Sequence, residues 1–226
     1  MKGKETKLIL VRHGQSLGNA EQFMQGQMDT PLTELGRAQA RALAKRLKTY
    51  DITAIYTSDL SRAHETARIV GAELGIEPIP DPRLREIDLG GWSGLTRDEV
   101  IARYPEEWNR WKEGKDIDHA GGESFSQFWL RIREALNEIV EKHRGETVLV
   151  VAHGGVTRMV ASKVLGLGFR EMFTDLPPMI NTGITEILVK GDSIELLSLS
   201  DTAHLEEEKI VGRTTSWWIG KKRKTE

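Results

Sequence analysis

Residues 8–14 read LILVRHG, an apolar run that stops at an arginine, a histidine and a glycine. Far along the chain, residues 148–155 read VLVVAHGG and repeat this pattern. Short runs of Val, Ile and Leu that are bounded by charge or glycine are typical of strands buried in a parallel sheet. If the two strands are neighbours, His13 and His153 lie at one edge of the sheet. The two stretches therefore predict a site at that edge.

The composition is that of an ordinary globular protein. The 226 residues suffice for one domain with its own core, and the net charge of −2 provides no overall field that would attract nucleic acid or a membrane surface. The chain has no cysteine, which excludes disulfides and thiolate metal ligands. Because no apolar run reaches the length of a signal peptide or a membrane span, we expect a cytoplasmic protein.

Strands and helices alternate along most of the chain. The hydrophobic pattern predicts buried strands at residues 7–11, 52–57 and 147–151, with a short strand near 79. Helical spacing predicts helices at residues 34–48, 62–74, 125–143 and 156–165. Apolar runs at 185–189 and 194–199 flank a Gly-Asp pair and predict a hairpin. The pattern predicts an α/β fold, a three-layer sandwich with a mostly parallel central sheet and helices on both faces.

Capping residues mark several helix ends. Thr33, Ser61 and Ser124 each precede a predicted helix and are the expected N-caps. Gly75 follows a predicted helix and is expected to end it in the left-handed conformation.

Residues 83–123 differ from the strand–helix units around them. They contain a Gly90-Gly91 pair and three tryptophans, Trp92, Trp108 and Trp111. We interpret this segment as an insertion in a single domain that spans residues 1–226. The tryptophans, with Trp129 just beyond, either line a pocket and favour a bulky substrate, or form a small core of the insertion.

The end of the chain is charged apart from Trp217 and Trp218, which we expect to dock the tail on the body or to contribute to a homodimer. The basic residues 221–224 are expected to be solvated.

The polar residues near the strand ends suggest phosphoryl chemistry. Arginine guanidinium groups match phosphate oxygens, so Arg12 and Arg62 suggest a phosphate site, to which backbone N–H groups of Gly14 or of residues 154–155 would contribute. A histidine beside such a site can attack phosphorus, with Glu86 as the acid that protonates the leaving oxygen. Taken singly, each of these residues is better explained as a surface or structural group. The two histidines at strand ends favour the functional interpretation.

A zinc or iron site is the competing chemical interpretation. It is weaker, because the sequence has no HExxH motif and no histidine pair at helical spacing. We therefore predict no metal site and no cofactor.

Several motifs resemble the histidine phosphatase superfamily, also called phosphoglycerate mutase-like. They are LVRHGQS at 10–16, TELGRAQA at 33–40, SDLSRA at 58–63, LREIDLGGWSG at 84–94, GGES at 121–124 and VAHGG at 151–155. The resemblance spans nearly the whole chain, and these motifs occur in the family's order. It implies that the insertion at about 83–123 is a lid over the carboxyl ends of the strands.

The resemblance also implies a role for each matching residue. His13 would be the phosphorylated nucleophile, and Arg12, Arg62 and His153 would hold the phosphoryl oxygens. Glu86 would be the proton donor and then the general base, with Asp88 as the alternative acid. The other substrate-binding positions would be Asn19, Gln25, Gly26 and Gly154. No metal or organic cofactor is implied.

The segment after Glu86 is similar to the phosphatase branch, since the longer basic insertion of the glycolytic mutases is missing. We expect a phosphatase that acts on a small-molecule phosphate monoester and binds neither nucleic acid nor membrane. A phosphoglycerate mutase is the first alternative, and a phosphohistidine-handling regulator or a protein that only binds is the second.

Overall fold

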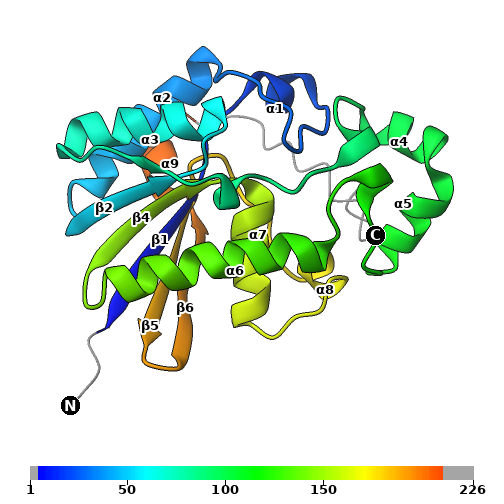
Figure 1. Ribbon diagram of the computed structural model, residues 1–226. Helices are drawn as coiled ribbons and strands as arrows, with labels where there is room; N and C mark the ends of the chain where they lie inside the picture. Colours follow the sequence, from blue (N-terminus) through cyan, green and yellow to red (C-terminus); the bar gives the residue numbers. More distant parts are fainter. Residues whose placement is uncertain (1–4, 211–226) are drawn as a thin grey trace, which may run out of the picture.

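A computed structural model describes residues 5–210, which form a sheet between two layers of helices (Figure 1). The strands are β1 (Thr6–Arg12), β2 (Ile52–Thr57), β3 (Ile79–Pro80), β4 (Thr147–Ala152), β5 (Ile184–Lys190) and β6 (Ser193–Asp201). Their order across the described sheet is β3-β2-β4-β1-β5-β6. The first four in this order are parallel, while β5 and β6 are antiparallel to their neighbours. The predicted α/β fold is confirmed.

Helices cover both faces of the sheet, because the central strand β1 has buried apolar side chains on both. On one face, Ile9 and Val11 of β1 belong to a core shared with α2 (Glu34–Leu47) and α3 (Ser61–Leu74). On the other face, Leu8 and Leu10 belong to a core shared with α6 (Phe125–Lys142) and α7 (Gly154–Val164). The run of four consecutive apolar residues in β1 is thus explained by burial on both sides.

The two strands that precede His13 and His153 are neighbours, as the sequence predicted. β1 and β4 are adjacent and parallel, with Arg12 opposite Ala152. The His13 N–H donates to the carbonyl oxygen of Ala152 (3.0 Å), which extends the ladder by one residue. The residues after both strands are therefore brought to the same edge of the sheet.

Most of the predicted caps are confirmed. Thr33 accepts from the Gly36 N–H, Ser124 forms a capping box with Gln127, and Gly75 ends α3 with φ of 71°.

The prediction that Ser61 caps α3 is wrong. Leu60 occupies the N-cap, and Ser61 is the first helical residue. The hydroxyl of Ser58 already accepts from the Leu60 N–H (3.3 Å), while Ser61 donates to Asp29 (2.7 Å). The helix after β4 also begins two residues earlier than predicted, at Gly154.

The remaining helices are short. They are α1 (Leu17–Glu21), α8 (Glu171–Thr174) and α9 (Ala203–Glu207) in the body, and α4 (Arg97–Arg103) and α5 (Pro105–Lys112) within residues 83–123. Figure 1 shows α4 and α5 together at one side of the molecule, apart from the helices that cover the sheet. Three 3₁₀ turns at Pro82–Leu84, Gly90–Trp92 and His119–Gly121 connect this segment to the body. The extent of the domain and the covering role of the segment stay predictions.

The tryptophans of this segment form a core. Trp92, Trp108 and Trp111 are buried, and the rings of Trp108 and Trp111 stack with their centroids 4.9 Å apart. The Trp92 ring packs against both of them and against His119. Of the two interpretations, the structure supports a core for these three residues, and this core is continuous with that of the body, since Trp111 also packs on Phe173 of α8.

No helix in the described part of the chain has both the length and the apolar character needed to cross a membrane. The predictions for Trp217, Trp218 and residues 221–224 concern positions outside the described residues.

Candidate active site

His13 and His153 lie together at the carboxyl edge of β1 and β4. Their ring centroids are 5.2 Å apart, and the side chains are almost completely buried. His13 lines a pocket, and the His153 ring packs edge-on against the ring of His13. The expectation that the two strand ends bring these histidines together is correct.

The surroundings of His13 fix which ring nitrogen carries the proton. Its Nδ1 is 2.6 Å from the carbonyl oxygen of Gly14, and a carbonyl oxygen only accepts. Nδ1 therefore carries the hydrogen, and Nε2 is left with its lone pair. Burial, followed by the charges of Arg62 and Arg12, holds the pKa of His13 well below its usual value. The ring is neutral at pH 7, which is the state that a nucleophile requires.

His153 is oriented by Ser58, a residue whose role the sequence did not reveal. The Ser58 hydroxyl accepts from the Leu60 N–H and lies 2.8 Å from Nε2 of His153, to which it can donate its hydrogen. In the tautomer in which Ser58 donates, Nδ1 of His153 carries the proton, and this nitrogen is buried without a hydrogen-bond partner among the described residues. Burial, with the charge of Arg62 next, holds the pKa of His153 well below its usual value.

Both arginines donate to backbone carbonyls, and Arg62 also lies 3.9 Å from a carboxylate oxygen of Asp29. Arg12 donates from Nη1 to Met179 (2.6 Å), and Arg62 donates to Gly26 (2.8 Å) and Met28 (2.9 Å). Burial lowers the pKa of each guanidinium to about 10, so both stay charged at pH 7. A surface ion pair is therefore the wrong interpretation for either residue.

Nitrogen donors without partners surround His13. Within the described residues, Nε of Arg12, Nε of Arg62 and Nδ1 of His153 are buried and make no hydrogen bond. A buried donor without a partner costs about 1–3 kcal/mol. An anion with several oxygen acceptors would satisfy these groups, and a phosphoryl group has that chemistry.

Glu86 lines the same pocket from the segment 83–123. One carboxylate oxygen accepts from the Ile87 N–H (3.0 Å) and the other from the Gly155 N–H (3.0 Å) at the start of α7. The carboxylate of Asp88 instead accepts from the Gly90 N–H, and Asp88 does not line this pocket. The geometry therefore favours Glu86 over Asp88 as the acid.

The predicted backbone contacts need a correction. The Gly14 N–H donates to the Thr66 hydroxyl (3.0 Å), so it is committed to the fold and is not available to an anion. The Gly155 N–H is occupied by the carboxylate of Glu86. Gly154 does line the pocket.

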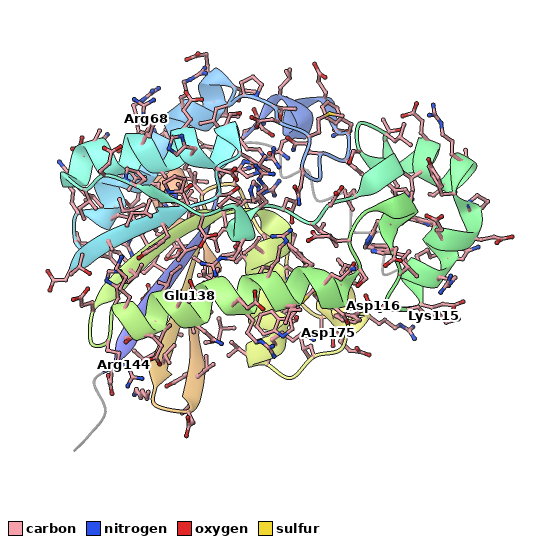
Figure 2. The ribbon with its side chains drawn as sticks, viewed as in Figure 1. Arg68, Lys115, Asp116, Glu138, Arg144 and Asp175 are labelled. Carbon is pink, nitrogen blue, oxygen red and sulfur yellow. The ribbon has the colours of Figure 1, made fainter. Side chains whose placement is uncertain are left out.

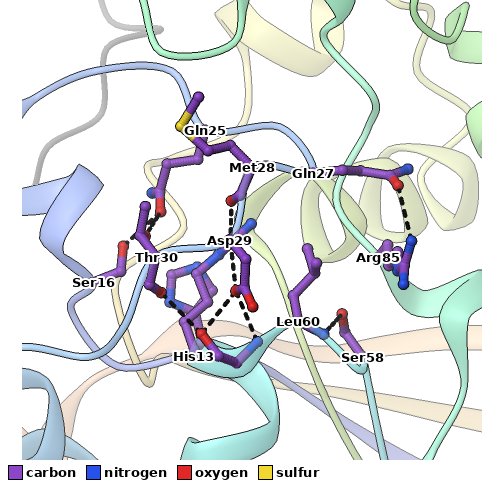
Figure 3. A network of polar contacts seen from close by, with 12 residues as sticks. His13, Ser16, Gln25, Gln27, Met28, Asp29, Thr30, Ser58, Leu60 and Arg85 are labelled. Carbon is purple, nitrogen blue, oxygen red and sulfur yellow. Dashed lines mark hydrogen bonds and ion pairs between the residues drawn. The ribbon is translucent and has the colours of Figure 1, made fainter.

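Asn19, Gln25 and Gly26 also line the pocket. Figure 3 shows the Gln25 side chain beside Ser16 and Thr30, whose hydroxyls donate to its Oε1. The Asn19 side-chain oxygen accepts from Asn181 in the same way. Since both amide oxygens are engaged, the NH₂ groups are the parts that can donate to a substrate.

Comparison with known proteins places the chain in a family. The model of the histidine phosphatase superfamily (branch 1) matches residues 8–202. The chain belongs to the histidine phosphatase superfamily.

Relatives of this histidine phosphatase have different names. It is 37% identical over 206 residues to phosphoglycerate mutase-like protein 4 of Arabidopsis thaliana, covering 89% of this chain and 87% of the relative. It is 34% identical over 202 residues to phosphoserine phosphatase 1 of Hydrogenobacter thermophilus, covering 89% and 95%. Among solved structures, YhfR of Bacillus stearothermophilus superposes with a TM-score of 0.82 at 38% identity, covering 88% and 99%. The family and its phosphatase members make the chain a phosphoric monoester hydrolase.

Sequence reasoning missed Arg158 of this histidine phosphatase. It lines the pocket from α7 and donates to the carbonyl oxygens of Met172 (2.7 Å) and Pro177 (2.8 Å). A single arginine among Val156, Met159 and other apolar residues of a buried helix was the signal that could have revealed it.

No cluster of three His, Asp or Glu side chains that could hold a metal ion occurs among residues 5–210.

Proposed function

We propose that this protein hydrolyses small organic phosphate monoesters through a phosphohistidine at His13, without a metal ion. The observation that carries the proposal is the set of buried, unpartnered donors of Arg12, Arg62 and His153 around a histidine whose Nε2 lone pair is free. Cationic and N–H donors that are already in place stabilise the charge of a transferring phosphoryl group without further reorganisation.

In the first step, Nε2 of His13 attacks phosphorus, and the bond between phosphorus and the ester oxygen breaks. The carboxylic acid of Glu86 gives its proton to the leaving oxygen, so the alcohol departs neutral. Arg12, Arg62 and the Nδ1–H of His153 donate to the phosphoryl oxygens during the transfer.

In the second step, the carboxylate of Glu86 takes a proton from water. The water oxygen attacks phosphorus, and the bond between phosphorus and Nε2 breaks. Inorganic phosphate leaves, and His13 and the acid form of Glu86 are regenerated. The same carboxyl thus acts as acid and then as base, as microscopic reversibility requires.

The pocket wall gives limited information on the substrate. Ile87, Leu89 and Met179 are its apolar residues, and the aromatic core of segment 83–123 is elsewhere. We therefore propose a small substituent on the phosphate rather than a bulky aromatic one.

Mutase activity is the second candidate, because several relatives are named phosphoglycerate mutase-like or probable phosphoglycerate mutase. The first chemical step would be the same, but the phosphoryl group would be passed to a second hydroxyl instead of water. The two activities differ in their product, since only hydrolysis releases inorganic phosphate.

The test is phosphate release from a panel of monoesters in EDTA, with the wild type beside His13→Ala. The panel contains p-nitrophenyl phosphate, phosphoserine, 3-phosphoglycerate, sugar phosphates and glucosyl-3-phosphoglycerate. We expect release that survives the chelator and is lost in the variant. Isomerisation of phosphoglycerate without release would make the protein a mutase. Turnover that stops in EDTA, or persists without His13, would overturn the proposal.

A further inference from the structure

Arg131 of α6 is directed at the segment that carries Glu86. Its Nη1 donates to the carbonyl oxygens of Arg83 (2.8 Å) and Arg85 (2.7 Å), and its Nη2 donates to that of Glu86 (2.8 Å). The two remaining N–H groups, on Nε and Nη2, donate to the carboxylate of Glu123 (2.6 and 2.7 Å). All five donors of the guanidinium are therefore engaged.

Glu123 holds the other side of the same segment. Its Oε2 accepts from the Asp88 N–H (2.9 Å) as well as from Arg131, and its own N–H donates to the carbonyl oxygen of Asp88 (2.9 Å). The backbone is thus bound before and after Glu86 by two side chains that also bind each other. The carbonyl oxygen of Glu123 is in turn held by Nδ1 of His119 (2.6 Å).

This support is needed because residues 85–89 belong to neither a helix nor a strand. The side chains of Arg131 and Glu123 are 17% and 21% exposed, so the ion pair is largely screened from water. The arrangement also depends on the shape of arginine. A lysine carries the same charge but has three donors and no planar fork.

We propose that Arg131 and Glu123 form a clamp that positions Glu86 for proton transfer. Neither residue lines the pocket, so the clamp consists of positioning residues and not catalytic ones. The inference rests on the proposed role of Glu86 as proton donor. It adds that the efficiency of that donor is set from outside the pocket, by two residues on α6 and just before it.

The clamp has a consequence that a purely structural role lacks. Protonation of the leaving oxygen matters most when that oxygen is strongly basic, as in an alkyl phosphate. It matters little for a nitrophenolate, which leaves without a proton. A displaced Glu86 should therefore slow alkyl substrates selectively, whereas general damage to the fold should slow both classes equally.

The experiment compares kcat/KM for phosphoserine and for 2,4-dinitrophenyl phosphate in the full chain. This ratio covers the steps up to transfer of the phosphoryl group, in which Glu86 acts as the acid. We expect Glu86→Gln to lower kcat/KM by about 10²–10⁴-fold with phosphoserine and by less than about threefold with the activated ester. Arg131→Lys, which retains the charge, should lower kcat/KM by about 10–100-fold with phosphoserine and by less than about threefold with the activated ester. Glu123→Gln should also lower kcat/KM selectively for phosphoserine.

Two matched controls lie on α6. Arg133 and Glu134 are both exposed. Arg133→Lys and Glu134→Gln repeat the same two chemical changes outside the clamp. Both controls should retain wild-type kcat/KM with either substrate.

A double variant adds a second criterion. If Arg131 acts only through Glu86, Arg131→Lys combined with Glu86→Gln should be no slower with phosphoserine than Glu86→Gln alone. Equal losses with both substrates, or additive losses in the double variant, would overturn the clamp. If Glu86→Gln itself shows no selective loss, the proposed function fails instead. If wild type turns over neither ester, the proton-donor role fails and the clamp fails with it.

Discussion

His13 and Glu86 line one pocket, but different kinds of structure hold them there. His13 continues the ladder between β1 and β4 through a backbone hydrogen bond to Ala152. Glu86 lies in a stretch without regular structure, which is bound by the side chains of Arg131 and Glu123. The nucleophile is thus placed by the sheet, whereas the backbone that carries the acid is held by hydrogen bonds from two side chains. Substitutions should damage the two sides in different ways.

A large effect is expected on the His13 side of the pocket, at Arg62 of α3. Arg62→Lys keeps a positive charge but removes the planar fork that holds Gly26 and Met28 and presents Nε to the pocket. We expect kcat/KM to fall by about 10²–10³-fold, as when a donor to transition-state charge is lost. The loss should be similar for phosphoserine and for 2,4-dinitrophenyl phosphate, since Arg62 holds the phosphoryl group and not the leaving oxygen. A loss confined to phosphoserine would remove the contrast with the Glu86 side.

A smaller effect is expected at Ser58. Ser58→Ala removes the hydrogen bond that orients the ring of His153. We expect kcat/KM to fall by about tenfold, which corresponds to the loss of one hydrogen bond. Ser61→Ala is the matched control, because Ser61 bonds Asp29 at the surface instead. If both variants keep full activity, His153 does not depend on Ser58.

Stability should depend on pH through the buried histidines. Burial lowers the pKa of His13, His153 and His119, and lowers that of His204 to about 4. Below pH 6.5 the unfolded chain binds protons that the folded chain does not, so the free energy of unfolding falls as pH falls. Each such histidine contributes a slope of up to about 1.4 kcal/mol per pH unit between its lowered pKa and 6.5.

Urea unfolding between pH 7.5 and 5 measures this slope, with His204→Asn as the comparison. The variant should have a shallower dependence, because one of the titrating groups is gone. A free energy of unfolding that is constant over this range would contradict the burial of neutral histidines at the site.

The smallest effect is expected at a surface ion pair whose nitrogen–oxygen distance equals that of the Arg131–Glu123 pair. Arg144, which is labelled in Figure 2, lies 2.6 Å from Glu141, the same distance as between Arg131 and Glu123. The side chains of Arg144 and Glu141, however, are about two-thirds exposed. Exposed pairs contribute little to stability. Arg144→Lys should leave both the urea midpoint and kcat/KM unchanged. A measurable loss at Arg144 would mean that distance alone, and not burial or partners, gives the clamp its effect.

The sequence predicted the sheet side of the site well. The strands before His13 and His153 are continuous apolar runs, and the parallel arrangement follows from the helices between them. The role of Arg131 could not be predicted, because its partners are backbone carbonyls some 45–48 residues away in sequence. Carbonyl acceptors have no signature in a sequence, since every residue has one.

Two further differences between the predicted and the observed structure have local causes. Ser61 was expected to cap α3, but it is the first helical residue, and its N–H and hydroxyl both donate to Asp29, while no side chain in the described part of the chain caps the helix. The tryptophans of segment 83–123 pack on one another, and their spacing could not tell a core from a pocket wall. Periodicity reports that a side chain is buried but not which neighbours bury it.

The most direct measurement is identification of the phosphorylated residue during turnover. Glu86→Gln, mixed with 2,4-dinitrophenyl phosphate, should accumulate the phosphoenzyme because the base for its hydrolysis is missing. Rapid quenching in alkali, followed by peptide mass spectrometry, is expected to place one phosphoryl group on His13. A phosphoryl group on another residue, or turnover of the activated ester with no phosphoenzyme under these conditions, would contradict the account.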